Sequence, residues 1–167
     1  MPMKRGAGGR MQNYDSYGRY AKAVRIPPMP TRKEKARQRE ERKREELFNR
    51  ARKSKDPYLF DVYIAIETEM PGEVVAVNAI KEEPHTQKRR EFDIITKKFI
   101  IEVKGGSGKD KTKQYFAQRD YAIEKRKQYI IVAPNMPYGT KKYLTKAGLV
   151  VVDHERDLIR KMKEYNG

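Results

Sequence analysis

Three charged side chains stand at unexpected places among the apolar residues of a segment that reads as a β-hairpin, EFDIITKKFIIEVKGG. They are Asp93, Glu102 and Lys104. If the two central lysines form a two-residue turn, the strand register sets Asp93 directly opposite Glu102, with β-carbons about 4.5–5.5 Å apart. Because side chains alternate along a strand, Lys104 lies on the same face as Glu102, one step further out. The spacing therefore predicts two carboxylates and an amine converging at one end of a hairpin.

This combination of groups has a defined chemistry. Two carboxylates at this separation repel each other unless a cation lies between them, and an oxygen-only pair suits Mg²⁺ or Mn²⁺. Such an ion can lower the pKa of bound water and neutralise charge on a phosphodiester under attack. Lys104 would then hold the scissile phosphate or orient the attacking water. The alternative interpretation is a cross-strand charge cluster on a solvated sheet face.

The order of these residues resembles that of the PD-(D/E)xK nuclease superfamily, which has the restriction-endonuclease-like fold. The resemblance rests on Asp93, eight intervening residues and a Glu-Val-Lys run at the end of a hairpin, followed by a helix and an apolar strand. It covers about residues 56–152. It implies a Mg²⁺-dependent endonuclease that hydrolyses DNA phosphodiester bonds, with the ion held by Asp93 and Glu102 and with Lys104 assisting. One departure is Phe92, which stands where the name-giving pattern has proline.

Many members of this superfamily carry a glutamine on the helix after the lysine. Here Gln114, Gln118 and Tyr121 fall on one helical face by their spacing of four and three. The resemblance implies a catalytic role for Gln118, whose amide would hold Lys104 in place or bind a DNA phosphate, and a nucleic-acid contact for Gln114. The alternative is that both glutamines are simply solvated.

Many members also carry an acidic residue on the helix before the first strand, and Glu67 is the matching candidate for a further metal ligand. It follows three apolar residues at helical intervals, so it would lie within an apolar stripe, where a carboxylate needs a cation. Glu69 and Asp61 are competing candidates. The assignment fails if residues 57–70 form a strand, because the same stretch also alternates between apolar and polar residues.

The elements that position these residues can be read from caps, stops and periodicity. Asp56 followed by Pro57 is typical of a helix start and Pro71-Gly72 of a stop, which favours a helix over a strand for the residues between them. Strands are expected at 73–81, 91–96, 99–104, 129–133 and 149–152, and further helices at 111–127, 138–147 and 154–165. This order predicts an α/β (α+β) layer fold, with a mixed central sheet flanked by helices as the resemblance implies.

Residues 1–31 form a separate, basic segment. Glycines and closely spaced prolines interrupt it, so we expect a flexible arm without regular elements. Its cations alternate with tyrosines, which would combine phosphate neutralisation with stacking on unpaired bases. The alternative is docking of the tyrosines on the domain or on a protein partner. The predicted nucleic-acid contacts of the arm are Arg10, Arg19, Lys22 and Arg25.

Residues 32–55 are rich in helix formers and nearly free of apolar side chains, which predicts a charged, solvent-facing helix before the domain of residues 56–167. Thr31 and Glu34 have the spacing of a capping box at its start. Within the domain, the run GGSGKD lacks the first glycine and the Ser/Thr of a phosphate-binding loop, and is interpreted as a flexible exit from the last hairpin strand. Its Lys109 is a further predicted nucleic-acid contact.

The composition restricts the class of protein and of partner. The 167 residues hold 39 Lys and Arg against 23 Asp and Glu, a net charge of +16, and residues 1–55 carry 18 basic and six acidic side chains. Such an excess predicts a polyanionic partner, most often nucleic acid, with a solubilising tail or an anionic membrane surface as the alternative. The absence of cysteine excludes disulfides and Cys-ligated metal sites. No apolar run approaches the roughly 20 residues of a membrane span, which predicts a soluble, non-secreted protein, cytoplasmic or phage-associated.

Three functions are compatible with these features. The first is a metal-dependent DNA endonuclease whose arm and charged helix add affinity. The second is a non-catalytic nucleic-acid-binding protein, or a phage virion or packaging protein, on the same fold; such a protein has no need of opposed carboxylates. The third keeps the nuclease and specifies its use, as a homodimeric junction resolvase, a phage recombination or packaging nuclease, or the catalytic part of a toxin.

Overall fold

The computed structural model describes residues 4–6, 10–12, 24–83 and 85–166, and it divides the chain into two compact units, Met1–Arg42 and Lys43–Gly167. In the first unit, β1 (Lys4–Gly6), β2 (Arg10–Gln12) and β3 (Val24–Arg25) pair as a small antiparallel sheet. The prediction that residues 1–31 contain no regular element is therefore wrong. Glycine and proline prevent long elements, but these strands are only two or three residues long.

Helix α1 (Arg32–Arg52) confirms the predicted charged helix, ending three residues before the predicted boundary. The capping box at its start is formed, because the Thr31 amide donates to Glu34 Oε2 at 2.6 Å and the Glu34 amide donates to Thr31 Oγ1 at 3.2 Å. Only Leu47 and Ala51 of this helix are buried, both near its end. The rest of its surface is polar and mostly exposed, as the sequence predicts.

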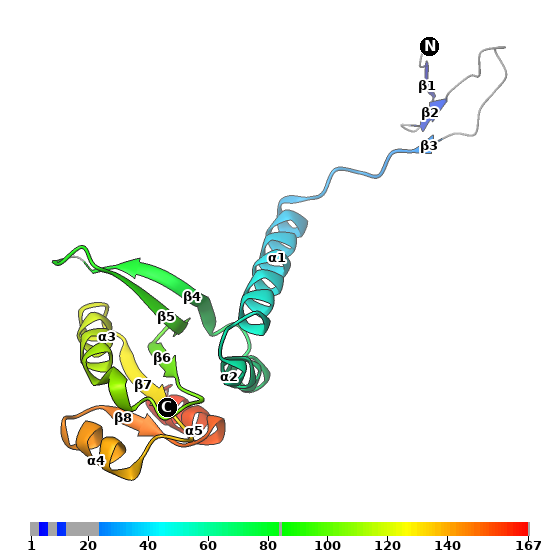
Figure 1. Cartoon of the computed structure of the whole chain (residues 1–167). Helices are drawn as coiled ribbons and strands as arrows, with labels where there is room; N and C mark the ends of the chain where they lie inside the picture. The colour runs from blue at the N-terminus through cyan, green and yellow to red at the C-terminus, as the bar shows by residue number, and fades with distance from the viewer. Residues whose placement is uncertain (1–3, 7–9, 13–23, 84, 167) are drawn as a thin grey trace. The chain divides into compact units, whose positions relative to one another are not determined.

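The second unit is an α/β domain built on a five-stranded mixed sheet, and the described residues of the chain hold five α-helices in all (Figure 1). The sheet order is β4-β5-β6-β7-β8, in which β4, β5 and β6 are antiparallel neighbours and β6, β7 and β8 are parallel. The elements are α2 (Pro57–Glu69), β4 (Val74–Glu82), β5 (Arg89–Thr96), β6 (Phe99–Val103), the 3₁₀ turn η1 (Lys109–Lys111), α3 (Thr112–Glu124), β7 (Gln128–Val132), α4 (Tyr138–Lys146), β8 (Val150–Val152) and α5 (Glu155–Asn166).

Helices cover both faces of this sheet. One layer joins the sheet to α2 and α5 through residues such as Ile66 and Leu158, and the other joins it to α3 and α4 through Tyr115 and Leu144. The connections from β6 to β7 and from β7 to β8 each contain a helix, as parallel neighbours require (Figure 1). Among the described residues, no helix is both long and apolar enough to cross a bilayer.

Residues 57–69 form a helix, so the favoured alternative is confirmed and the strand is excluded. Its start is fixed by Asp56, whose backbone is extended and whose side-chain Oδ1 accepts the Tyr58 amide at 3.0 Å, with proline in the first turn. After the helix, Gly72 adopts a φ of +81°, a conformation that glycine takes without strain. The signals at the two ends therefore decide what the periodicity of the segment leaves open.

The remaining predicted elements are all present, with shifted ends. Strand β5 begins at Arg89, inside the stretch that the sequence assigns to a loop. The predicted helix 111–127 begins as η1 and ends at Glu124, since Arg126 has a φ of +57° that a helix cannot contain.

The hairpin of β5 and β6 has the predicted register, with Ile94 opposite Ile101 and Ile95 opposite Ile100. The backbone pairing stops at Ile94 and Ile101. The prediction that Asp93 and Glu102 form the next regular pair of the ladder is therefore wrong. In the neighbouring strand, Asn78 has a φ of +47° between Val77 and Ala79, which pair with the residues on either side of Asp93. A left-handed residue in a strand breaks the alternation of faces and kinks the ladder.

The same kink is visible in the packing. Val77 belongs to the α2 and α5 layer, whereas Ala79, two residues on, belongs to the α3 and α4 layer. On the partner strand, Ile94 and Phe92 divide between the layers in the same way. The outer part of the β4–β5 hairpin therefore turns toward α3, beyond the last residue paired with β6.

Candidate functional site

Glu102 is the centre of the site. It lies on β6 between Ile101 and Val103 and is only 2% exposed. Its Oε2 accepts a hydrogen bond from Gln118 Nε2 at 2.9 Å, and its Oε1 accepts one from Gln114 Nε2 at 3.3 Å. A buried carboxylate requires such partners, so α3 provides the polar environment that keeps Glu102 inside the domain.

Asp93 converges on Glu102 despite the kink. Its Oδ2 accepts the Val103 amide at 2.8 Å, which ties the end of the paired part of β5 to the residue after Glu102. Burial and, next, the charge of Glu102 raise the pKa of Asp93 to about 8. The negative charge of Glu102 thus opposes the ionisation of Asp93, and the structure brings the two carboxylates together as predicted.

Lys104 completes the predicted set of three. Its amide donates to the Val132 carbonyl at 2.9 Å, which continues the parallel pairing with β7, and its Nζ lies 2.8 Å from Glu102 Oε1. Burial alone would lower the pKa of Lys104, but the charges of Glu102, Asp93 and Asp56 outweigh it and raise the pKa. The amine is therefore a protonated, positively charged group at neutral pH.

Gln118 is fully buried, and every polar atom of its amide has a partner. Its Nε2 donates to Glu102 and to the Glu91 carbonyl at 3.2 Å, and its Oε1 accepts the Tyr129 hydroxyl at 2.5 Å. The side chain thus holds Glu102, not Lys104, and both of its N–H groups are already engaged. Gln118 is a positioning residue in this arrangement.

Sequence reasoning missed two buried tyrosines that border the site. Tyr129 on β7 fixes the orientation of the Gln118 amide, and Tyr115 on α3 donates to the Gly108 carbonyl at 2.9 Å. Burial and then the charge of Glu102 raise the pKa of both tyrosines. A signal was present in each case, because a tyrosine in a buried element needs a hydrogen-bond partner for its hydroxyl.

Asp56 is the third residue that sequence reasoning did not place at the site. Besides capping α2, it accepts the Gly105 amide at 2.8 Å, and the carbonyl of Gly105 accepts a hydrogen bond from Asn135 Nδ2 at 2.6 Å. A β-carbon at Gly105 would lie 2.7 Å from Asp56 Oδ1, too close for any other residue without a shift. The residue after Lys104 is thus held from both sides.

The predicted further ligand is not brought to this pair. Glu67 is partly exposed on α2, and within the described ranges no three acidic or histidine side chains are grouped so that they could hold one ion. Of its competitors, Glu69 pairs with Lys163 at 2.9 Å and Asp61 is exposed. The buried face of α2 consists of other residues than the predicted stripe, namely Leu59, Val62, Tyr63 and Ile66. Of the three apolar residues that precede Glu67 at helical intervals, only Tyr63 is buried, while Phe60 is partly buried and Ile64 is exposed.

The predicted nucleic-acid contacts are only partly placed. Lys109 is exposed on η1, whereas Gln114 is partly buried and contacts Glu102. Arg19 and Lys22 lie outside the described residues. Arg10 and Arg25 lie on β2 and β3, where the backbone alone is described. The arm's part in binding stays a prediction.

The site as a whole is a pair of carboxylates, the buried Glu102 and the partly buried Asp93, beside an amine at the end of β6. One member of the pair has its pKa raised by burial and by its neighbour, and the other is oriented by two amides. Such a pair gains from a bound cation, which removes the repulsion between the two charges. Comparison of the chain with protein-family models, with curated proteins and with solved structures finds no match, so its chemistry has to be inferred from these residues themselves.

Proposed function

We propose that this protein is a metal-dependent endonuclease that hydrolyses DNA phosphodiester bonds. The observation that carries the proposal is the pair of the partly buried Asp93 and the buried Glu102, with the Lys104 amine 2.8 Å from one carboxylate. Structural charge clusters of this kind are usually exposed, whereas burying two carboxylates side by side is costly without a cation. This free-energy cost is offset where a bound cation takes part in the reaction.

The fold supports the same reading. A helix, an antiparallel three-stranded unit, a crossover helix and a parallel strand follow one another, which is the order that the restriction-endonuclease-like resemblance implies. The three charged residues stand at the positions in that order where the superfamily pattern has its motif. Fold-level analogy raises the expectation of a nuclease, and the residues of the site have to carry it.

The donor set fits Mg²⁺ or Mn²⁺. Mg²⁺ is commonly bound through one or two carboxylates, with water and substrate phosphate in its other positions, so Asp93 and Glu102 would suffice. The hydrogen bonds from Gln114 and Gln118 orient the Glu102 carboxylate. Oε1 accepts from both Gln114 and Lys104, so Oε2, which accepts only from Gln118, keeps a lone pair for the ion. When bound, the ion would activate water and neutralise charge on the phosphate.

Lys104 would act as a cation and not as a base. Its raised pKa keeps the amine protonated, and a protonated amine stabilises the charge that develops on the phosphate oxygens as the bond is cleaved. The contact with Glu102 holds the amine at the site, and the hydrogen bond from the Gly105 amide to Asp56 fixes the backbone next to Lys104. Lys104 thus needs no large rearrangement before the reaction.

The substrate follows from charge. A net charge of +16 favours a polyanion, and the cleavable polyanions with phosphodiester links are nucleic acids. Junction cleavage by a homodimer, a role in phage recombination or packaging, and a structural role in a virion all stay predictions. They differ in the DNA structure that is preferred and in whether any bond is cleaved.

The decisive experiment compares supercoiled plasmid, linear duplex, single-stranded and four-way-junction DNA with Mg²⁺, Mn²⁺, Ca²⁺ or chelator. We expect cleavage with Mg²⁺ or Mn²⁺ and a loss of at least 100-fold in Asp93→Asn and in Glu102→Gln, with DNA binding in Ca²⁺ retained. Glu69→Gln, an exposed carboxylate on α2, is the matched control. Near-wild-type cleavage by Glu102→Gln would contradict the proposal, and binding without cleavage in every metal would favour the non-catalytic role.

A further inference from the structure

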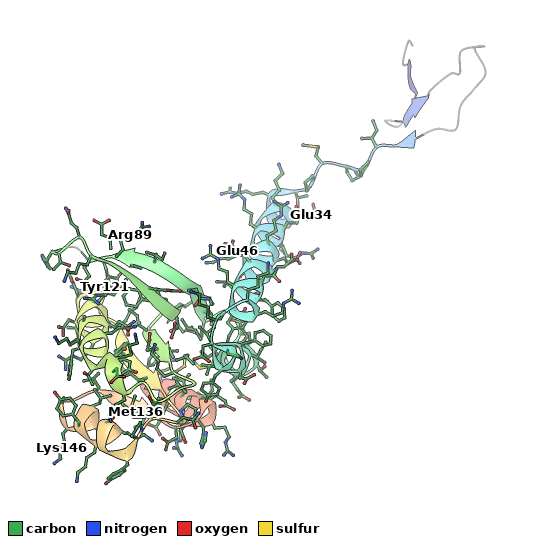
Figure 2. The ribbon with its side chains drawn as sticks, viewed as in Figure 1. Glu34, Glu46, Arg89, Tyr121, Met136 and Lys146 are labelled. Carbon is green, nitrogen blue, oxygen red and sulfur yellow. The ribbon has the colours of Figure 1, made fainter. Side chains whose placement is uncertain are left out.

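An open hollow lies between the β4–β5 hairpin and α3, next to the site. It has a volume of about 530 Å³ and is lined by four cations, by Glu91 and by the two glutamines that contact Glu102. Figure 2 shows Arg89 on the hairpin, on the same side of the domain as the helix that carries Tyr121. We call it the cationic hollow; its cations are Lys88, Arg89, Arg90 and Lys113.

Most of these cations are not neutralised by the protein. Arg90 forms an ion pair with Glu83. Lys88, Arg89 and Lys113 make no ion pair and no side-chain hydrogen bond with any other residue that the structure describes, and all three are exposed. Glu91 is the one acidic residue in the lining, so the hollow keeps a net positive charge.

The hollow lies beside the residues that orient Glu102. Gln114 and Gln118 line it, and the same two amides donate to the Glu102 carboxylate. The hairpin wall consists of Lys88 and of the β5 residues Arg89, Arg90 and Glu91, which lie beyond the last pair of β5 with β6. A chain lying in the hollow would therefore pass next to the amides that hold Glu102.

We propose that the cationic hollow binds the sugar-phosphate backbone of one nucleic-acid strand, on one side of the bond to be cleaved. Its position relative to that bond rests on the proposed function. Unpaired lysines and arginines release condensed counterions when they contact phosphates, and the Arg89 guanidinium can donate two parallel hydrogen bonds to one phosphate. Its volume falls in the range of pockets that hold ligands of nucleotide size, about 300–1,000 Å³.

This hollow differs from the arm as a binding surface. The arm's cations belong to the first unit. Arg89, in contrast, lies on β5, the strand that carries Asp93, and Lys113 lies on α3, whose two glutamines contact Glu102. Contacts on fixed elements set the register of a strand on the protein. The cationic hollow would therefore decide which phosphate reaches Glu102, and not only how tightly DNA is bound.

The test compares two double variants with the same loss of charge in the full chain. Arg89→Ala/Lys113→Ala removes two cations of the hollow, and the control Lys53→Ala/Lys161→Ala removes two exposed cations, of which Lys161 lies on α5 in the opposite layer. Binding of labelled single-stranded and duplex oligonucleotides is measured by anisotropy in Ca²⁺ from 50 to 300 mM salt. Unfolding midpoints establish that both variants are folded.

We expect the hollow variant to lose at least tenfold in affinity and to flatten the slope of log affinity against log salt by about two units on duplex DNA, at about 0.9 per lost phosphate contact. The control should change affinity less than threefold. In cleavage, KM should rise while kcat at saturating DNA stays within a few-fold. Equal effects of the two double variants would overturn the proposal, as would an acidic protein competing better than DNA for the hollow.

The two proposals fail in different ways. If wild-type protein cleaves DNA but the hollow variant behaves like the control, the nuclease stands and the hollow does not bind the strand. If wild-type protein cleaves nothing but the hollow variant loses DNA binding, the hollow is a nucleic-acid site and the nuclease proposal is wrong.

Discussion

Removal of one hydroxyl group, in Tyr129→Phe, tests whether the site is held in place by hydrogen bonds around Glu102. The Tyr129 hydroxyl donates to Gln118 Oε1 at 2.5 Å, and Gln118 is fully buried. Without it, the amide oxygen is a buried acceptor that has lost its donor, which costs about 1–3 kcal/mol in the free energy of unfolding. Phenylalanine keeps the ring and its packing, so the loss belongs to the hydrogen bond.

The functional effect is expected to exceed the effect on stability. The Tyr129 hydroxyl anchors the oxygen end of the Gln118 amide, so its removal leaves that amide held only by its N–H bonds to Glu102 and the Glu91 carbonyl and loosens the partner that orients Glu102. Losing the group that orients a metal ligand typically costs about 10–100-fold in metal affinity or activity. We therefore expect the Mg²⁺ concentration for half-maximal cleavage to rise about tenfold or more.

The assays are guanidinium unfolding and a Mg²⁺ titration of DNA cleavage, each with Tyr138→Phe as the control at a residue that is 77% exposed. A lower unfolding free energy with an unchanged Mg²⁺ requirement would refute the positioning role and leave Tyr129 a purely structural residue. No change in either measurement would refute the hydrogen bond itself.

Two further predictions concern Asp93 and Gly105. The folded pKa of Asp93, about 8, exceeds its unfolded value of about 3.9, so its contribution to stability without metal is fully present below pH 4 and is lost as the pH rises to 8. In chelator, the unfolding midpoint should therefore decrease as the pH is raised from 5 to 8, and it should decrease less in Asp93→Asn. Mg²⁺ should restore the midpoint of the wild-type protein at pH 8. An equal dependence of the midpoint on pH in both proteins would contradict this prediction. Gly105→Ala places a β-carbon 2.7 Å from Asp56 Oδ1, so we expect it to lower the free energy of unfolding by about 1 kcal/mol or more and to reduce the cleavage rate by a larger factor than this loss of stability explains. Gly106→Ala, where nothing lies within 4 Å of the added β-carbon, should change neither quantity appreciably. A Gly105→Ala protein as stable and active as Gly106→Ala would show that the close approach is unimportant.

The sequence predicts the domain well where its signals are local. The cap at Asp56 and the stop at Gly72 identify α2, and the two-residue turn fixes the register of the β5–β6 hairpin. These features depend on neighbours along the chain, and caps and turns have strong residue preferences.

The parts that sequence reasoning missed depend on distant contacts. The second hydrogen bond of Asp56 joins residues 49 apart in the chain, and the bond from Tyr129 to Gln118 joins β7 to α3. No periodicity encodes them. Glu67 shows a different error. Helical spacing predicted the side of α2 on which Glu67 lies, but it could not predict which other elements that side of the helix contacts.

The peptide at Gly105 has a consequence for how the protein assembles. Its two hydrogen bonds join it to Asp56, 49 residues earlier, and to Asn135, 30 residues later. Contacts between residues so distant in the chain form only after the intervening segments have been closed into loops, which makes them slow to appear. During synthesis, Asp93, Glu102 and Lys104 are all added to the chain before Asn135, so the nascent chain carries the three charged groups before both hydrogen bonds of the Gly105 peptide can form. The site is thus completed late, when the parallel half of the sheet has formed.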